Sequence, residues 1–138
     1  MRLLIIVSAM LFSNIALAAT TYNCSAKGKD GVLRIVDTRF AEPRIDFYPT
    51  GDRYTDDKRK MKQVYVSDLA ASDNKKLSGY VMTKKSVNLG AAKFRTSVYF
   101  QKELLQGADT VRVVYMSETL SFRNKVMNRS TSYYTCRR

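Results

Sequence analysis

The sequence predicts an all-β protein, a small antiparallel β-barrel of about eight or nine short strands, with a two-sheet β-sandwich as the alternative. Segments in which apolar and polar residues alternate recur along the chain, which is typical of half-buried antiparallel strands. No Pro-rich linker or internal repeat separates these segments. The only two cysteines, Cys24 and Cys136, lie near the two ends of this region and indicate one disulfide between the first and last strands.

The chain begins with the three-part plan of a secretory signal peptide. Arg2 precedes an apolar stretch, and Ala16-Leu17-Ala18 supplies the small residues that a signal peptidase recognises, so we expect cleavage after Ala18 or Ala19. The apolar stretch is shorter than the roughly 20 residues that a membrane-spanning helix needs. We therefore expect residues 1–19 to be a cleaved signal peptide and residues 20–138 to form one β-domain, secreted or periplasmic and without an integral membrane span.

The clearest strand is predicted from Ala92 to Phe100. Alternate positions such as Val98 and Phe100 are apolar, while Lys93 and Arg95 lie on the opposite face. The same reasoning, applied to less regular patterns, predicts further strands at residues 21–27, 32–38, 44–48, 61–67, 77–83, 110–116, 120–126 and 131–136.

Turns and helical segments are fewer. Asp30-Gly31 is predicted to form a tight hairpin turn between the first two strands. The segment Gln101–Gln106, followed by Gly107, is predicted to form one or two helical turns that end at the glycine. Thr55 precedes a highly charged segment that is either a capped helical turn or an exposed loop.

The two cysteines also restrict the topology. A disulfide requires Cα atoms within about 7 Å, so the terminal strands must be neighbours or must face each other across the core. In an antiparallel meander, neighbouring terminal strands would close the sheet into a barrel, whereas a bridge between two sheets would indicate the sandwich. Cross-linking so long a loop is expected to stabilise the fold by about 4 to 5 kcal/mol in the chain-entropy model.

The chain is strongly basic. It carries 24 Lys and Arg against 12 Asp and Glu, a net charge of +12, and loss of Arg2 with the signal peptide would leave +11. Such a charge favours anionic partners, which outside the cytoplasm include lipopolysaccharide, anionic lipid, acidic polysaccharide and nucleic acid. The alternative is that the positive charge only keeps the surface solvated.

The basic residues on the polar faces of predicted strands are the candidate anion-binding residues. Arginine pairs with phosphate and carboxylate groups through two parallel hydrogen bonds, and an exposed tyrosine can stack on a ring of the ligand. The candidates are Arg34, Arg44, Lys93, Arg95, Arg112 and Arg123, with Tyr99 and Tyr48 available for stacking. The alternative is that these residues are outward positions that only discourage aggregation.

The composition argues against an enzyme and against a metal or other cofactor. There is no histidine, and no cysteine remains if the disulfide forms, which removes imidazole and thiol chemistry and most transition-metal ligands. The acidic residues Asp52, Asp56 and Asp57 lack the spacing of a calcium loop. Ser72 and Lys75 have the spacing of a Ser–Lys catalytic pair but lie in a stretch of turn composition.

The function expected from these observations is non-enzymatic binding of an anionic envelope or extracellular polymer. One alternative is a protein–protein module, such as an inhibitor or an envelope assembly factor, and another is a carrier of a small apolar ligand. The general layout and the Ser78-Gly79-Tyr80 segment are similar to those of secreted lysozyme inhibitors of the small-barrel type. Such inhibitors bind a basic enzyme, and the charge of +11 argues against that role.

Overall fold

The structure is a computed structural model that describes residues 18–37, 42–50 and 62–138. Its described part is all-β, as predicted, with nine strands: β1 (Ala18–Ala26), β2 (Lys29–Asp37), β3 (Arg44–Thr50), β4 (Lys62–Tyr65), β5 (Ala70–Ala71), β6 (Tyr80–Leu89), β7 (Ala92–Gln101), β8 (Thr110–Leu120) and β9 (Val126–Arg137). Three short 3-10 helices connect them: η2 (Val66–Asp68), η3 (Lys75–Leu77) and η4 (Lys102–Gln106). No helix in these residues is long and apolar enough to cross a membrane.

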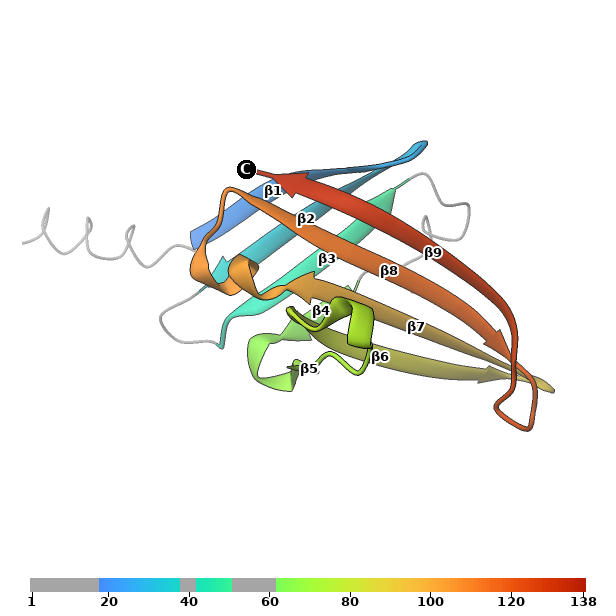
Figure 1. Cartoon of the computed structure of the whole chain (residues 1–138). Coiled ribbons are helices and arrows are strands. Elements are labelled where there is room, and N and C mark those ends of the chain that lie inside the picture. The colour runs from blue at the N-terminus through green and yellow to red at the C-terminus, as the bar shows by residue number, and fades with distance from the viewer. Residues whose placement is uncertain (1–17, 38–41, 51–61) are drawn as a thin grey trace, which may run out of the picture.

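The nine strands form one antiparallel sheet in the order β4-β3-β2-β1-β9-β8-β7-β6-β5. This is a meander whose last strand returns to pair with the first, so the two edges of the sheet are β4 and β5. The sheet curls into a half-barrel rather than two packed layers (Figure 1). The predicted pairing of terminal strands is confirmed, but the sheet stays open between β4 and β5.

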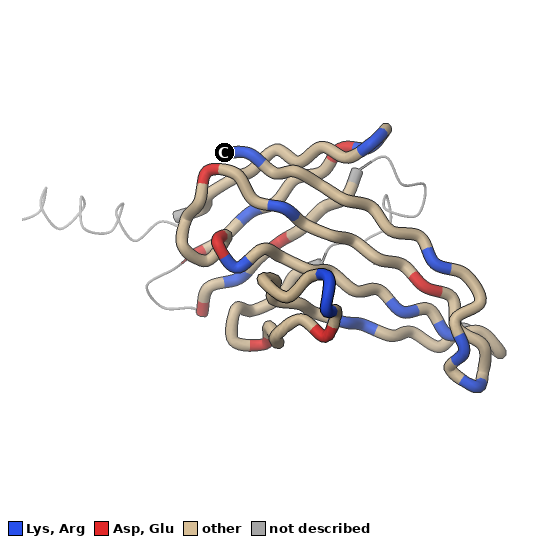
Figure 2. The backbone as a smooth tube through the Cα atoms, in the orientation of Figure 1, with Lys and Arg blue, Asp and Glu red and all other residues tan. Residues whose placement is uncertain are grey.

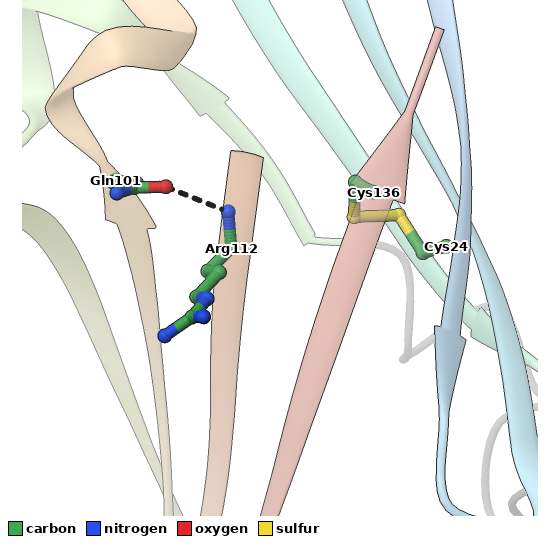
Figure 3. The surroundings of a disulfide bond; sticks show 4 residues. All are labelled: Cys24, Gln101, Arg112 and Cys136. Atoms are coloured by element: carbon green, nitrogen blue, oxygen red, sulfur yellow. Dashed lines mark hydrogen bonds between the residues drawn. A yellow bond between two sulfur atoms is a disulfide. The ribbon is translucent and has the colours of Figure 1, made fainter. Parts of the chain in front are cut away.

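The disulfide lies where β1 meets β9. These strands pair over only three residues each, and Cys24 lies directly opposite Cys136. The two Cα atoms are 3.9 Å apart, and Figure 3 shows the bond crossing from one strand to the other. The predicted cross-link is therefore confirmed, and it reinforces the three-residue ladder that joins the two halves of the sheet.

The core fills the concave inner face. Its largest buried rings are Tyr22, Phe47, Phe100 and Tyr134, which come from four different strands. The centroid of the Phe47 ring lies 5.3 Å from that of Tyr134 and 6.4 Å from that of Phe100, both in edge-to-face arrangements. The buried Tyr22 hydroxyl donates a hydrogen bond to the carbonyl of Ala108 at 2.7 Å, so its polar end is satisfied.

Several local predictions need correction. The first hairpin turns at Lys27 and Gly28, where Gly28 has φ of +72°, and Asp30-Gly31 lies within β2. The predicted strand over 120–126 is instead the hairpin connection, because Leu120 ends β8 and Val126 begins β9.

Other local predictions are confirmed or lie outside the described residues. The helical segment before Gly107 is confirmed as η4, and Gly107 ends it with φ of +77°. The charged segment after Thr55, the acidic residues Asp52, Asp56 and Asp57, and residues 1–17 of the predicted signal peptide are not among the described residues.

Candidate anion-binding surface

Strands β6 to β9 run on beyond the core and end in two neighbouring hairpins, which we call the distal end (residues 84–97 and 116–131). Figure 1 shows these hairpins projecting away from β1–β3. The loss of core packing toward the distal end is visible along the inner face of β7, where the exposed fraction of the side chain rises from 1% at Val98 to 40% at Phe94. Side chains on the inner face of the distal end are thus accessible, whereas Ser97, Glu118 and Leu120 in the same segments are buried.

The distal end concentrates positive charge. Its two segments carry seven cationic side chains and one carboxylate, a net charge of +6, which is half of the chain's total of +12. Figure 2 shows these basic positions gathered around the two hairpins. The cationic residues are Lys84, Lys85, Lys93, Arg95, Arg123, Lys125 and Arg129. Such an uneven distribution creates a local field that favours anions.

The single carboxylate, Glu118 on β8, organises two of the arginines. Its side chain is only 3% exposed and accepts hydrogen bonds from Arg95 Nε at 3.1 Å and from Arg129 Nε and Nη2 at 3.2 and 2.9 Å. Burial raises the pKa of Glu118, but the two guanidinium groups outweigh this effect and hold that pKa below its ordinary value. The trio keeps one net positive charge and leaves further N–H donors of both arginines available.

The β8–β9 connection is a well-defined turn. The backbone N–H of Ser121 donates to the carbonyl of Lys125, and the N–H of Asn124 donates back to the carbonyl of Ser121, both at 2.9 Å. The Ser121 hydroxyl accepts a third hydrogen bond from the N–H of Lys125 at 3.2 Å. Asn124 has φ of 60°, a left-handed conformation that asparagine tolerates better than most residues. Lys93 Nζ donates to Asn124 Oδ1 at 3.4 Å and links this turn to β7.

Exposed apolar side chains gather at the same end. Of the eight large apolar or aromatic side chains exposed in the described part of the chain, five lie in the two distal segments: Val87, Phe94, Phe122, Val126 and Met127. Phe122 and Met127 are the most exposed, at 79% and 71%. The guanidinium carbon of Arg123 lies 5.4 Å from the centre of the Phe122 ring, which is a cation–π contact.

The segment around Asp73, between β5 and η3, covers part of the outer face of the sheet next to the distal end. Asp73 accepts a hydrogen bond from the Tyr99 hydroxyl at 3.1 Å and forms an ion pair with Lys84. These partners, Lys84 first, lower the pKa of Asp73, while burial and then Asp73 raise that of Tyr99. Tyr99 is only 3% exposed and packs with Met82 and Val114. It therefore does not form the outward stacking surface that the sequence suggested.

A second basic feature lies on the outer face, next to the segment around Asp73. An open groove of about 430 Å³ is lined by Lys76, Tyr80, Arg112 and Tyr133 among others, and no carboxylate lines it. The Arg112 side chain forms no ion pair with the described residues, while its backbone N–H donates to Gln101 Oε1 at 3.0 Å (Figure 3). The groove offers two cations beside tyrosine rings but much less charge than the distal end.

The remaining candidates, Arg34 and Arg44, lie in the other half of the sheet, on β2 and β3. Arg34 on β2 is exposed, and it lies directly opposite Asp46 of β3 in the register of the ladder. The buried Asp46 accepts two hydrogen bonds from Arg44, at 2.8 and 3.1 Å. Both arginines therefore lie beside a carboxylate, which weakens the local positive field.

The structure thus brings together three of the six predicted cationic residues, namely Lys93, Arg95 and Arg123, the last in a turn rather than on a strand. The sequence reasoning missed Lys84, Lys85 and Arg129 because the strands predicted over 77–83 and 131–136 stopped short of them, and it missed Lys125 although the predicted strand over 120–126 included it. Past Met116 the alternation of apolar and polar residues fades, because Ser117 and Thr119 flank Glu118, so it gave no signal that β8 continues.

Comparison of the chain with models of protein families, with curated proteins and with solved structures finds no match.

Proposed function

We propose that this protein is an exported, non-enzymatic binding protein that attaches to an anionic envelope or extracellular polymer through its distal end. The observation that carries the proposal is the concentration of seven cationic side chains, with a single carboxylate, in the two distal hairpins. Phosphate, sulfate and carboxylate groups on a repeating polymer would meet several of these cations at once, and such contacts add up.

The scaffold supports this role. The cations lie on hydrogen-bonded strands and on a tight turn rather than on long loops, so little backbone freedom is lost on binding. Arg95 and Arg129 are held in place by Glu118 and keep free donors. A disulfide is typical of proteins that fold outside the reducing cytosol, which agrees with the predicted export segment.

The test compares two variants with the same loss of charge. The distal variant replaces Lys93, Arg123 and Lys125 by Gln, and the control variant replaces the exposed Lys75, Lys102 and Arg137 by Gln. Binding to lipopolysaccharide, anionic vesicles, dextran sulfate and single-stranded DNA is measured as the salt concentration rises from about 50 to 200 mM.

We expect the distal variant to bind its preferred anion about a hundredfold more weakly at low salt, since each cation near an anionic surface contributes on the order of 1 kcal/mol. The control variant should lose less than about threefold by the same reasoning, because its cations lie away from the contact. Equal losses would show that the charge acts generically, and no binding to any of the four probes would refute the proposal.

The alternative functions have less support. A carrier of an apolar ligand would need a hollow interior, whereas the rings of Phe47, Phe100 and Tyr134 fill the described inner face. A protein–protein module would be favoured by a saturable protein partner whose binding survives high salt.

A further inference from the structure

The tip of the β8–β9 hairpin combines cations with exposed apolar side chains, and a purely electrostatic surface would not need the apolar ones. Phe122 and Met127 expose most of their apolar area to water, and Val126 between them is 38% exposed. Arg123 and Lys125 lie within the same short stretch of sequence. A soluble polyanion would use the cations alone, whereas a lipid surface offers phosphates above an apolar layer and would use both.

We propose that this tip inserts Phe122 and Met127 into the upper hydrocarbon layer of an anionic phospholipid bilayer, while the surrounding cations contact the lipid phosphates. The inference deepens the proposed function and rests on it, because the distal end must first be attracted to an anionic surface. It adds an apolar contact and selects one ligand class among the possible anions.

The backbone of the turn is suited to an apolar environment. A peptide N–H that leaves water without a partner costs several kcal/mol in hydrocarbon, which normally keeps irregular loops out of it. In this turn the N–H groups of Ser121, Asn124 and Lys125 already donate to acceptors within the turn. The tip can therefore approach the acyl chains without breaking backbone hydrogen bonds to water at these three positions.

The charged side chains are placed to remain at the phosphate level. Arg123 stacks on the Phe122 ring, so its guanidinium lies beside the inserting group. Long basic side chains extend from apolar positions to the polar interface, and Arg123 and Lys125 have the length to do so. The other cations of the distal end lie farther along β6, β7 and β9 (Figure 2), and charge complementarity with anionic headgroups would favour them.

The predicted attachment is shallow and reversible. Interfacial segments place their apolar side chains about 5–10 Å into the boundary between headgroups and acyl chains. Two apolar side chains do not anchor a protein permanently, so release at high salt is still expected.

The chain contains no tryptophan, which allows a single fluorescent reporter to be introduced. In Phe122→Trp, we expect a blue shift of the emission on vesicles that contain phosphatidylglycerol, and quenching by lipids brominated on their acyl chains. Tyr133→Trp is the matched control, because Tyr133 is 69% exposed but lies in the groove outside the distal end. This control should show neither change.

A second pair of measurements separates the apolar contact from charge. The double variant Phe122→Ser, Met127→Ser should bind anionic vesicles at least tenfold more weakly than the wild-type protein, because two apolar side chains no longer leave water. Its affinity for dextran sulfate, which has no apolar layer, should be unchanged.

Two outcomes would overturn the insertion while leaving the proposed function intact. The first is binding of wild-type protein to dextran sulfate and to vesicles with no blue shift in Phe122→Trp. The second is an equal loss of dextran sulfate and vesicle binding in the double serine variant. If the wild-type protein binds neither vesicles nor any soluble polyanion, the proposed function itself fails.

Discussion

Strands β6 to β9 have a core end and a distal end, and the two ends differ in what covers their inner face. At the core end, side chains such as Phe100 and Val113 belong to the hydrophobic core. On β7, Phe100 is fully buried against Phe47, whereas Phe94, six residues earlier on the same face, is 40% exposed. The disulfide also lies at the core end, where Cys24 and Cys136 are buried. An alternating strand therefore stabilises the fold only where a second part of the curled sheet covers it, and its uncovered end is free to contact other molecules.

Two phenylalanine substitutions test this difference most directly. Phe47→Ala should lower the free energy of unfolding by about 3–5 kcal/mol, because it leaves a cavity between Phe100 and Tyr134. Phe94→Ala, which removes the same side chain from the distal end, should cost less than about 1 kcal/mol, because its ring is already partly in water. Equilibrium unfolding in urea measures both, and comparable losses would mean that the distal end belongs to the core.

The sequence was sufficient to predict the faces of the strands but not their ends. Period-2 alternation assigns Phe100 to the core whether or not its strand continues, so the core residues of β7 were predicted correctly. Between the core and Phe94, the inner face of the distal end carries Thr96, Ser117 and Ser130 rather than apolar residues. The alternation fades there, and the strands predicted over 77–83, 110–116 and 131–136 were too short, whereas the strand predicted over 92–100 matches β7.

The organisation of the distal charges could not be predicted from the sequence either. Glu118 contacts Arg95 and Arg129, which lie 23 and 11 residues away along the chain. Their contact depends on the register of two ladders, and a shift by one residue would move each side chain to the opposite face. Tyr99 was misjudged for a related reason, because the segment around Asp73 that covers it has no periodic pattern.

Glu118→Gln is expected to separate stability from binding. Loss of the charged hydrogen bonds to Arg95 and Arg129 should lower the free energy of unfolding by about 1–3 kcal/mol at neutral pH. The same change raises the net charge of the distal end by one and releases donors, so binding to dextran sulfate should tighten. A variant that is less stable but binds more tightly would show that Glu118 stabilises the fold at the expense of anion binding.

The pH dependence provides an independent check of Glu118. Its pKa is lowered in the folded protein, so its contribution to stability is complete above the ordinary value of 4.5. This contribution is lost as the pH falls below 4.5 and through the folded-state pKa. The difference in unfolding free energy between wild type and Glu118→Gln should therefore shrink in acid, and a constant difference would contradict the assigned ion pairs.

Asp73→Asn should have the smallest effect, because the Asp73–Lys84 pair lies at the border between the two ends and is well exposed. The side chains of Lys84 and Asp73 are 36% and 49% exposed, and exposed ion pairs contribute about 0–1 kcal/mol. Asparagine can still accept the hydrogen bond from the Tyr99 hydroxyl, so the covering segment should stay in place. Urea unfolding should show a loss of no more than about 1 kcal/mol.

Tyr99→Phe is the matched control, since it removes that hydrogen bond and leaves the ion pair with Lys84 intact. The two variants should differ in salt dependence, because only the Asp73–Lys84 contribution is screened by added salt. If Asp73→Asn instead costs several kcal/mol and exposes the cluster of Met82, Tyr99 and Val114, the segment around Asp73 is a structural part of the core end. The boundary between the core end and the distal end would then lie farther along β6 and β7.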